Sequence, residues 1–321
     1  MSSQREGRTL PVANASVRVH LLDGGSFGKA DIAKLHNGRH GEIRLYDWCF
    51  LIQHRNSGRN ILWDLGISSD RTLYTPWVLP MYDEVEAIGP RQTLQEQLRD
   101  RGVEPKQVDT VIFSHAHWDH CRPFTKEFPN ARAYFGPGTK RHCSPGHLEN
   151  GEASSNVQWD GRFFDIDGRA TEPWSELEGP WKKFDPFHNA MDFFGDGSVW
   201  IIQAPGHMPG NLCAAVKVEG SDSWVVLGSD CCHSRAILEG EEDIAIFQLP
   251  DGEMMSLHSD IAAARETIAR LRRGEHDFKM HIALAHDIEW MKSAKDDVLI
   301  SLLSAQMKSE WLSRVRQGER P

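Results

Sequence analysis

No stretch of this sequence is apolar over the length that a membrane-spanning helix needs, and the opening residues MSSQREGRTL lack the apolar core of a signal peptide. The six cysteines show no framework spacing and two of them are adjacent, so reduced thiols are expected. No Pro/Gly/Ser-rich linker or low-complexity run divides the chain. We therefore expect a cytoplasmic protein with no membrane partner and a single domain over residues 1–321.

A surplus of basic residues is also missing. Lys and Arg number 36 against 46 Asp and Glu, which gives a formal net charge of −10, and the basic residues are scattered. This balance disfavours nucleic acid as a partner and fits small neutral or cationic substrates better. The hydrophobic content of 40% and the charged content of 26% are ordinary for a soluble globular protein.

One short stretch, SHAHWDH at residues 114–120, concentrates metal-binding side chains. It arranges His115, His117, Asp119 and His120 as H-x-H-x-D-H, directly after VDTVIF, a β-branched apolar run that predicts a strand. Imidazoles and carboxylates without thiolates suit zinc, iron, manganese or cobalt. A lone histidine in a loop is usually solvated or hydrogen-bonded, but four such donors together favour a site for two metals. Two metals require further donors downstream.

Three later strands supply ligand-type residues just past their carboxyl ends. The strand within SVWIIQAPGHMPG is followed by His207, SWVVLGSD ends in Asp230, and KMHIALAHD presents His286. An earlier apolar strand, NILWDLG, ends at Asp64. We interpret Asp64 either as a residue that orients a metal-bound histidine or as a turn aspartate bonded to its own backbone.

The predicted elements follow the order of an α/β protein. Alternating residues predict strands over 16–25, 43–54 and 60–66, which would form an antiparallel meander. A helix predicted over 91–102 leads into the strand before the histidine stretch. Strand, helix, strand and metal loop together indicate an α/β arrangement.

The second half of the chain contains an irregular region and two predicted helices. Residues at about 138–196 are aromatic and show no sustained period. We interpret them as an active-site lid insertion, the alternative being a surface excursion with its own apolar cluster. Apolar stripes predict helices over 260–273 and 294–317 that cover outer sheet faces.

These residues resemble the metallo-beta-lactamase superfamily from about residue 16 onward. The resemblance implies an α/β fold, the four-layer αβ/βα sandwich, with a metal site along one edge of its sheets. It also implies two Zn²⁺ ions as cofactors, with Fe, Mn or Co as possible replacements. By the same resemblance one metal would be held by His115, His117 and His207, the other by Asp119, His120 and His286, and Asp230 would bridge both.

The bridging position selects a branch of the superfamily. Antibiotic-hydrolysing members generally have cysteine there, whereas the chain has Asp230, and the arrangement looks closer to N-acyl homoserine lactonase-like and lactam-opening hydrolases. Those lactonases often carry a tyrosine three residues later, where this chain has His233. We predict that a hydroxide shared by the two metals attacks a ring carbonyl, that Asp119 relays a proton, and that His233 donates a hydrogen bond or proton.

A small lactone or lactam is the predicted partner, with the protein a monomer or homodimer. An aromatic pocket would hold the ring. The predicted pocket residues are Tyr74, Trp77, Met81, Trp159, Phe163, Phe164 and Trp181. Two alternatives stay open: a glyoxalase II-like thioesterase with the same ligands, and a persulfide dioxygenase-like redox enzyme with one iron.

Overall fold

Alternating apolar and polar residues in the first third of the chain pair into one sheet of the computed structural model, which describes residues 10–149, 152–165, 168 and 170–321. β1 (Arg18–Asp31), β2 (Glu42–His54) and β3 (Arg59–Trp63) form the antiparallel meander predicted from the sequence. Beyond β3 the sheet continues with three parallel strands, β5 (Thr110–Ile112), β6 (Arg132–Phe135) and β9 (Trp174–Glu176). At the other edge the short strand β4 (Ala87–Ile88) pairs with β1. The resulting order is β4-β1-β2-β3-β5-β6-β9.

Continuous apolar runs form the second sheet, whose central strands are buried on both faces. Its order is β10-β11-β12-β13-β14-β17, antiparallel except for the parallel pair of β14 with β17. Burial on both faces explains why these runs do not alternate with polar residues. The strands are β10 (Lys182–Phe184), β11 (Phe187–Asp192), β12 (Val199–Gln203), β13 (Leu212–Lys217), β14 (Trp224–Leu227) and β17 (His281–Ala283).

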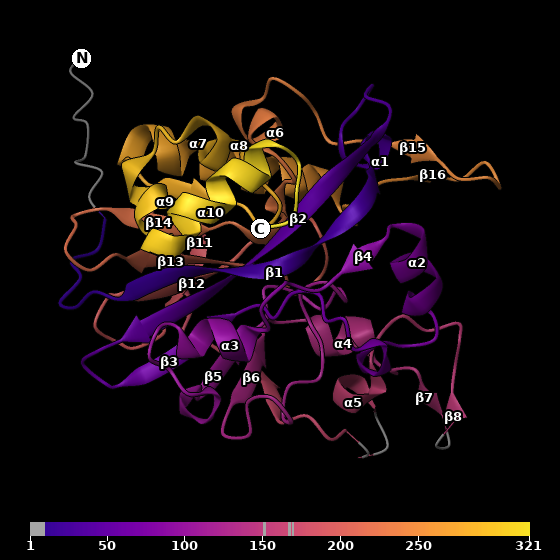
Figure 1. Ribbon diagram of the computed structural model, residues 1–321, viewed down its shortest axis with the longest axis horizontal. Coiled ribbons are helices and arrows are strands. Elements are labelled where there is room, and N and C mark those ends of the chain that lie inside the picture. The colour runs from indigo at the N-terminus through magenta and orange to yellow at the C-terminus, as the bar shows by residue number, and fades with distance from the viewer. Residues whose placement is uncertain (1–9, 150–151, 166–167, 169) are drawn as a thin grey trace.

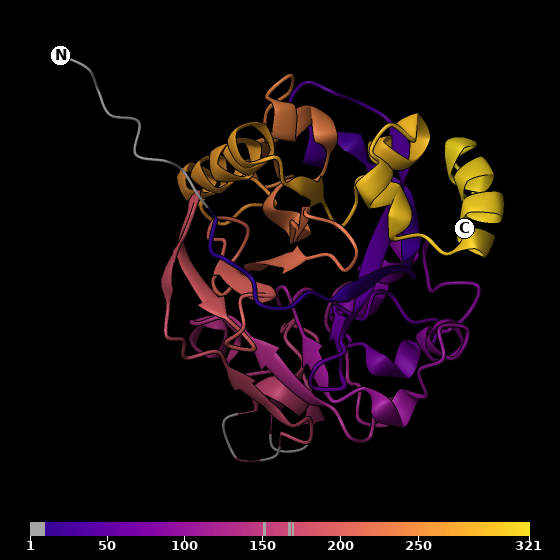
Figure 2. The ribbon, with the colours of Figure 1, turned by 90° about the vertical axis from the view of Figure 1, so that its left-hand side faces the viewer.

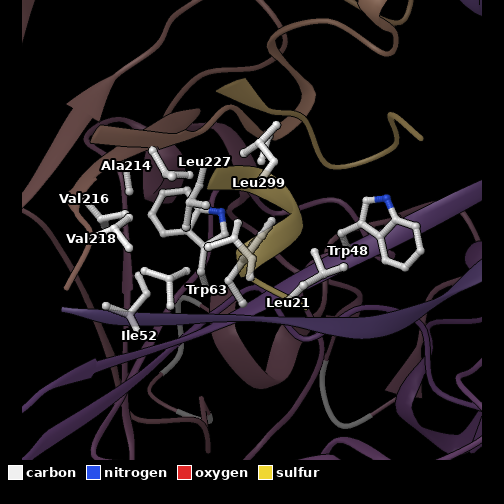
Figure 3. Packing of buried hydrophobic residues seen from close by; sticks show 14 of the residues in the cluster. Leu21, Trp48, Ile52, Trp63, Ala214, Val216, Val218, Leu227 and Leu299 are labelled. Carbon is white, nitrogen blue, oxygen red and sulfur yellow. The ribbon is translucent and has the colours of Figure 1, made fainter. Parts of the chain in front are cut away.

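The main hydrophobic core lies between the two sheets (Figure 3). Leu21, Trp48 and Trp63 of the first sheet pack in one cluster with Ala214 and Leu227 of the second, and each of these side chains is at most 1% exposed. Burial of large side chains on both inner faces fixes the register of the strands, because a slip of one residue would turn these side chains outward.

Helices cover the outer face of each sheet (Figures 1 and 2). On the first sheet α3 and α5 bury Leu98 and Phe163, and on the second α7 buries Ile268 and Leu271. The helices are α1 (Ile32–Leu35), α2 (Val78–Glu84), α3 (Leu94–Arg99), α4 (Thr139–Cys143), α5 (Gly161–Phe164), α6 (Arg235–Glu239), α7 (Ile261–Phe278), α8 (Glu289–Ser293), α9 (Asp297–Ser301) and α10 (Ala305–Arg316). Helix, sheet, sheet and helix form the predicted four layers.

Short elements complete the described parts of the chain. They are the 3-10 helices η1 (Arg71–Leu73), η2 (Pro105–Gln107) and η3 (Ser229–Cys231), and the two-stranded pairs β7 (Leu148–Glu149) with β8 (Glu152–Ala153) and β15 (Phe247–Gln248) with β16 (Met254–Met255). None of the helices described here combines the length and apolar character required to span a membrane.

The predicted helix over 294–317 is wrong in two respects. Two helices, α9 and α10, replace it, because Ser304 begins α10 by accepting a hydrogen bond from the Met307 amide. Both helices bury residues in the core between the sheets, including Leu299 and Trp311, instead of covering an outer sheet face.

The region 138–196 is not one insertion. Its second half contains β9, which extends the first sheet, and β10 and β11, which form an edge of the second. Residues 150–151, 166–167 and 169 of this region lie outside the described residues. A lid function for residues at about 138–196 stays a prediction.

Candidate metal centre

The ligand-type residues singled out in the sequence all follow strands. Asp64 comes directly after β3, the histidine stretch follows β5, and Asp230 lies in η3 after β14. His207 lies in the connection from β12 to β13 and His286 follows β17. Because β3 and β5 are parallel, and β14 and β17 are parallel, the carboxyl ends of each pair meet at one sheet edge.

Three histidines form the first group. His117 Nδ1 is 3.0 Å from His115 Nε2 and 2.9 Å from His207 Nε2. The three nitrogens converge within 4.8 Å of one another, so they could hold one metal ion. Side chains from the two different sheets therefore meet at a single point.

A second group of four residues lies beside the first. Asp119, His120, Asp230 and His286 are all buried and offer ligand atoms within 4.8 Å of one another. Asp230 Oδ1 is 3.2 Å from His286 Nε2 and 3.4 Å from His120 Nε2. Asp119 Oδ2 is 3.5 Å from His120 Nε2 and 3.7 Å from His286 Nε2.

Asp230 joins the two groups. Its Oδ1 faces His120 and His286, and its Oδ2 lies 3.3 Å from His286 Nε2, 3.6 Å from His207 Nε2 and 4.0 Å from His115 Nε2. Within the described part of the chain, the buried atoms His120 Nε2 and Asp230 Oδ1 have no hydrogen-bond partner. Buried polar atoms without partners are rare, and convergent imidazole nitrogens and carboxylate oxygens are the donor set of a divalent metal, so these residues fit one.

The outer ring nitrogens of three of these histidines are held by neighbours, whereas His207 Nδ1 has no hydrogen-bond partner among the described residues. His120 Nδ1 lies 3.0 Å from Asp64 Oδ2, and His286 Nδ1 lies 2.6 Å from the carbonyl oxygen of Tyr46. His115 Nδ1 is 3.0 Å from Ser114 Oγ. An N–H bonded to oxygen on one side of the ring leaves a lone pair on the other, so these contacts prepare the nitrogens that face the cluster to bind metal.

Charge within the cluster also suits a cation. Burial lowers the pKa of His115 and His207 well below the usual value, and nearby histidines lower it further, so both rings are neutral. Burial alone would lower the pKa of His286, but Asp230 outweighs this and raises it to about 9. The same negative field that protonates His286 attracts a divalent cation.

Comparison with known proteins finds a family to which part of the chain is similar. Residues 44–126, from β2 to the loop that contains the histidine stretch, match the model of the metallo-beta-lactamase superfamily. The chain contains a metallo-beta-lactamase superfamily domain. A solved N-acyl homoserine lactone hydrolase, with N-hexanoyl-L-homoserine bound at its catalytic metal centre, shares this fold at a TM-score of 0.60 with 20% identity. The match covers 87% of this chain and 96% of that one.

Three curated relatives are similar over much of the metallo-beta-lactamase domain. The cytochrome P450 monooxygenase mpaDE′ of Penicillium brevicompactum is 26% identical over 87% of this chain and 34% of its own length. The metallo-hydrolase mfmC of Annulohypoxylon moriforme is 30% identical over 60% and 49%. The gamma-lactamase FDB1 of Fusarium pseudograminearum is 27% identical over 70% and 55%. The chain thus spans between a third and about half of the length of these relatives.

Aromatic side chains lie beside the candidate metal centre, and their role as a substrate pocket stays a prediction. Trp159 stacks on His117, with ring centroids 6.0 Å apart and an interplanar angle of 10°. Tyr74 and Trp77 belong to an aromatic cluster that also includes Phe27 and Trp118. Phe27 in turn lies 6.2 Å from the His286 ring. Phe27 and Trp118 were not predicted, although Trp118 stands within the histidine stretch itself.

Other predicted pocket residues lie elsewhere. Phe163 and Phe164 are 1% and 2% exposed and pack with Phe135 beneath the first sheet, so they are core residues. Trp181 packs against the core between the sheets. Apolar residues in an irregular segment cannot be divided into pocket and core from the sequence, because both environments favour them. Met81 lies partly buried in α2, and its pocket role stays a prediction.

Two further histidines extend the cluster. His233 Nε2 lies 3.3 Å from Asp230 Oδ2. His258 was not singled out in the sequence. Its ring centroid is 5.2 Å from that of His207 and 5.3 Å from that of His233. Burial and the neighbouring His233 lower the pKa of His258 to about 3, so its ring is neutral near pH 7.

Proposed function

We propose that the protein is a metal-dependent hydrolase that opens the ring of a small lactone or lactam, and that two Zn²⁺ ions are its cofactors. The observation that supports this most strongly is the position of Asp230, whose carboxylate lies within 3.6 Å of His120, His286 and His207, which belong to both ligand groups. A carboxylate placed in this way suits a bridge between two metals. His115, His117 and His207 would hold one of them, and Asp119, His120 and His286 the other.

The donor set favours zinc over magnesium or calcium, because five of the six unshared donors are imidazoles. When bound, a pair of such ions supplies a deprotonated water near neutral pH and polarises the carbonyl under attack. The surrounding residues then orient the groups that react. Asp64 holds the His120 ring and the Tyr46 carbonyl holds the His286 ring, so neither ligand has to be ordered during the reaction.

Proton transfer is the task we assign to Asp119. In ring opening, the water oxygen bonds to the carbonyl carbon, the bond from that carbon to the ring oxygen or nitrogen breaks, and the leaving atom gains a proton. Asp119 Oδ2 lies within 3.7 Å of both His120 and His286, so it is positioned to accept the water proton and pass it on. A lactam depends on this step more than a lactone, since an amide nitrogen leaves poorly without a proton.

His233 is our candidate for a hydrogen bond to the substrate. It is 5% exposed and reaches Asp230 with Nε2, which places its ring beside the proposed bridge. A donor aimed at a developing oxyanion typically contributes about 3 kcal/mol to transition-state stabilisation. The aromatic groups on the other sides, Trp159 over His117 and Trp118 near Phe27, would enclose a flat or acylated ring. The relatives named as a gamma-lactamase and a lactone hydrolase agree with a cyclic substrate.

Metal analysis with a hydrolysis screen tests this proposal. The purified protein would be assayed on acyl homoserine lactones, aromatic fused lactones and small fused lactams, before and after chelation. We expect about two metal ions per chain and ring opening that stops on chelation and returns with zinc. One iron per chain without ring opening would overturn the proposal in favour of thiol oxidation. Thiol release from a glutathione thioester without ring opening would support the thioesterase alternative.

A further inference from the structure

His258 lies in the segment between β16 and α7, which sequence reasoning left without a role. The segment spans the two sides of the site: Leu257 packs against the aromatic cluster of Phe27 and Tyr74, and the next residue, His258, packs against His207 and His233. His258 therefore sits where the histidine side and the aromatic side of the site come together.

Backbone hydrogen bonds fix this segment to the loop that carries His207. The amide of Ser259 donates to the carbonyl of His207 at 2.9 Å, and the amide of Asp260 donates to the carbonyl of Gly206 at 2.9 Å. Asp260 also caps α7, an 18-residue helix, through the Ala263 amide. The position of His258 is thus set by a long helix and by a predicted metal ligand, and a side chain so constrained retains little freedom to turn away.

The bonding of His258 differs from that of three predicted ligands, and also from that of His207, which has one unpartnered ring nitrogen, Nδ1, among the described residues. His115, His120 and His286 each have the ring nitrogen away from the cluster held by oxygen. His258 is 4% exposed, yet neither of its ring nitrogens has a hydrogen-bond partner among the residues that the structure describes. A buried polar group without a partner is destabilising, so the site provides a donor and an acceptor that something else must satisfy.

We propose that His258 is a substrate-binding residue, and that its imidazole hydrogen bonds a substituent on the ring that both donates and accepts, a secondary amide or a hydroxyl. This assignment rests on the proposed ring-opening function and narrows its substrate class. An amide or a hydroxyl group can act as donor or as acceptor, so either one could give a partner to a ring nitrogen of His258 that has none among the described residues. An unsubstituted ring would leave His258 unsatisfied and would bind less well.

Two lactones with similar apolar tails test the assignment. N-hexanoyl homoserine lactone carries a secondary amide, and γ-decalactone does not. Zinc-loaded wild type, His258→Leu and His258→Gln would be compared, with His188→Leu in β11 as a control at an exposed histidine. We expect His258→Leu to lower kcat/KM for the amide substrate about ten- to a hundredfold, mainly by raising KM. The kcat/KM for γ-decalactone should change less than threefold. His258→Gln should recover most of the loss.

Binding of the ring-opened product, N-hexanoyl homoserine, measured by calorimetry, gives a readout that does not depend on turnover. It should weaken about tenfold or more in His258→Leu while the metal content stays that of wild type. Equal losses on both lactones, or unchanged product binding, would overturn the role of His258 and leave the hydrolase intact. Absence of ring opening in wild type on both lactones, with no product binding, would overturn the proposed function and this assignment together.

Discussion

Asp64 shows how one side chain sets the chemistry of a neighbour. Its backbone is left-handed, with φ of 60°, a conformation that aspartate and asparagine tolerate better than most residues. One carboxylate oxygen accepts from the Ser114 amide at 2.6 Å and the other faces His120 Nδ1 at 3.0 Å. An acceptor at Nδ1 keeps the proton there, so Nε2, the atom that faces Asp119 and Asp230, has a free lone pair.

Asp64→Asn should therefore weaken metal binding without disturbing the turn. The new amide can still accept from Ser114, but its N–H₂ group would face His120 Nδ1 and favour the tautomer with the proton on Nε2. We expect one of two metals to bind about 10- to 100-fold more weakly, measured by competition with a chromophoric chelator. Asp83→Asn, at an exposed position in α2, is the control. Equal affinities in both variants would show that Asp64 does not orient His120.

Asp23 predicts a pH dependence of stability. It is 3% exposed, and burial raises its pKa from 3.8 to about 6 despite the Gly25 amide and the Arg320 and Arg91 side chains, which lower it. The folded protein thus holds this proton at pH values where the unfolded chain has released it, so the carboxyl group disfavours folding increasingly as pH rises from about 4 to 6. The cost above pH 6 is about 3 kcal/mol.

Asp23→Asn should remove this pH dependence. Urea unfolding of both proteins, each treated with chelator, would give the free energy of unfolding from pH 4 to pH 7. We expect the variant to gain about 2–3 kcal/mol relative to wild type across that range. The sign of the difference in the free energy of unfolding decides the outcome. If Asp23→Asn becomes less stable than wild type as pH rises, Asp23 is ionised in the folded protein and stabilises it.

The residues of the site differ in how visible they are in sequence. His115, His117, Asp119 and His120 stand together, so their spacing alone identified them. His258 stands alone in the polar segment DGEMMSLHSD, where nothing distinguishes it from a solvated histidine. Hydrogen bonds from the two residues after it to Gly206 and His207 help to bring it to the site, and such long-range pairing leaves no local pattern.

At the level of elements, α7 packs closely against the loop after β12 at Gly206. This glycine has φ of +133°, and a Cβ built on it would lie 2.3 Å from Ala264 Cα in the first turn of α7. Only a residue without a side chain allows the helix to approach so closely. Since His207 is the next residue, the packing of α7 determines where this predicted ligand stands.

Gly206→Ala should for this reason affect both stability and metal binding. We expect a loss of about 2–4 kcal/mol in the free energy of unfolding, from the backbone conformation and the contact with Ala264 together, and weaker binding of one metal. Gly220→Ala is a matched control, because Gly220 also has positive φ but has nothing within 4 Å of its added Cβ. Urea unfolding and metal titration would separate the two effects. Unchanged metal affinity in Gly206→Ala would show that α7 does not position His207.

Elements with their own periodic pattern were predictable, and elements defined by distant partners were not. The meander of β1, β2 and β3 alternates visibly, and α7 has a clear apolar stripe. The strands β9, β10 and β11 are short and join different sheets, so their identity depends on ladder partners far along the chain. The break between α9 and α10 had a local signal in the capping Ser304, which the continuous apolar stripe concealed.

For the whole molecule, the site links the two halves of the sandwich. Asp64 and the histidine stretch belong to loops of the first sheet, whereas His207, Asp230 and His286 follow strands of the second. The main core between the sheets holds the halves together by burial, and metal bound at the shared edge would add a second connection. An unfolded chain cannot present these donors together, so binding free energy becomes folding free energy.

Chelation should therefore destabilise the whole protein. With each site filled at a metal concentration about 100-fold above its dissociation constant, each ion contributes about 2.7 kcal/mol, so removing two should lower the free energy of unfolding by about 5 kcal/mol. Urea unfolding with and without chelator would measure the loss. Asp230→Asn is the informative control, because Asp230 is the residue that both ligand groups share. Chelator should lower the free energy of unfolding of this variant much less than that of wild type. Equal responses in the two proteins would mean that the stabilising metal is bound somewhere other than this cluster.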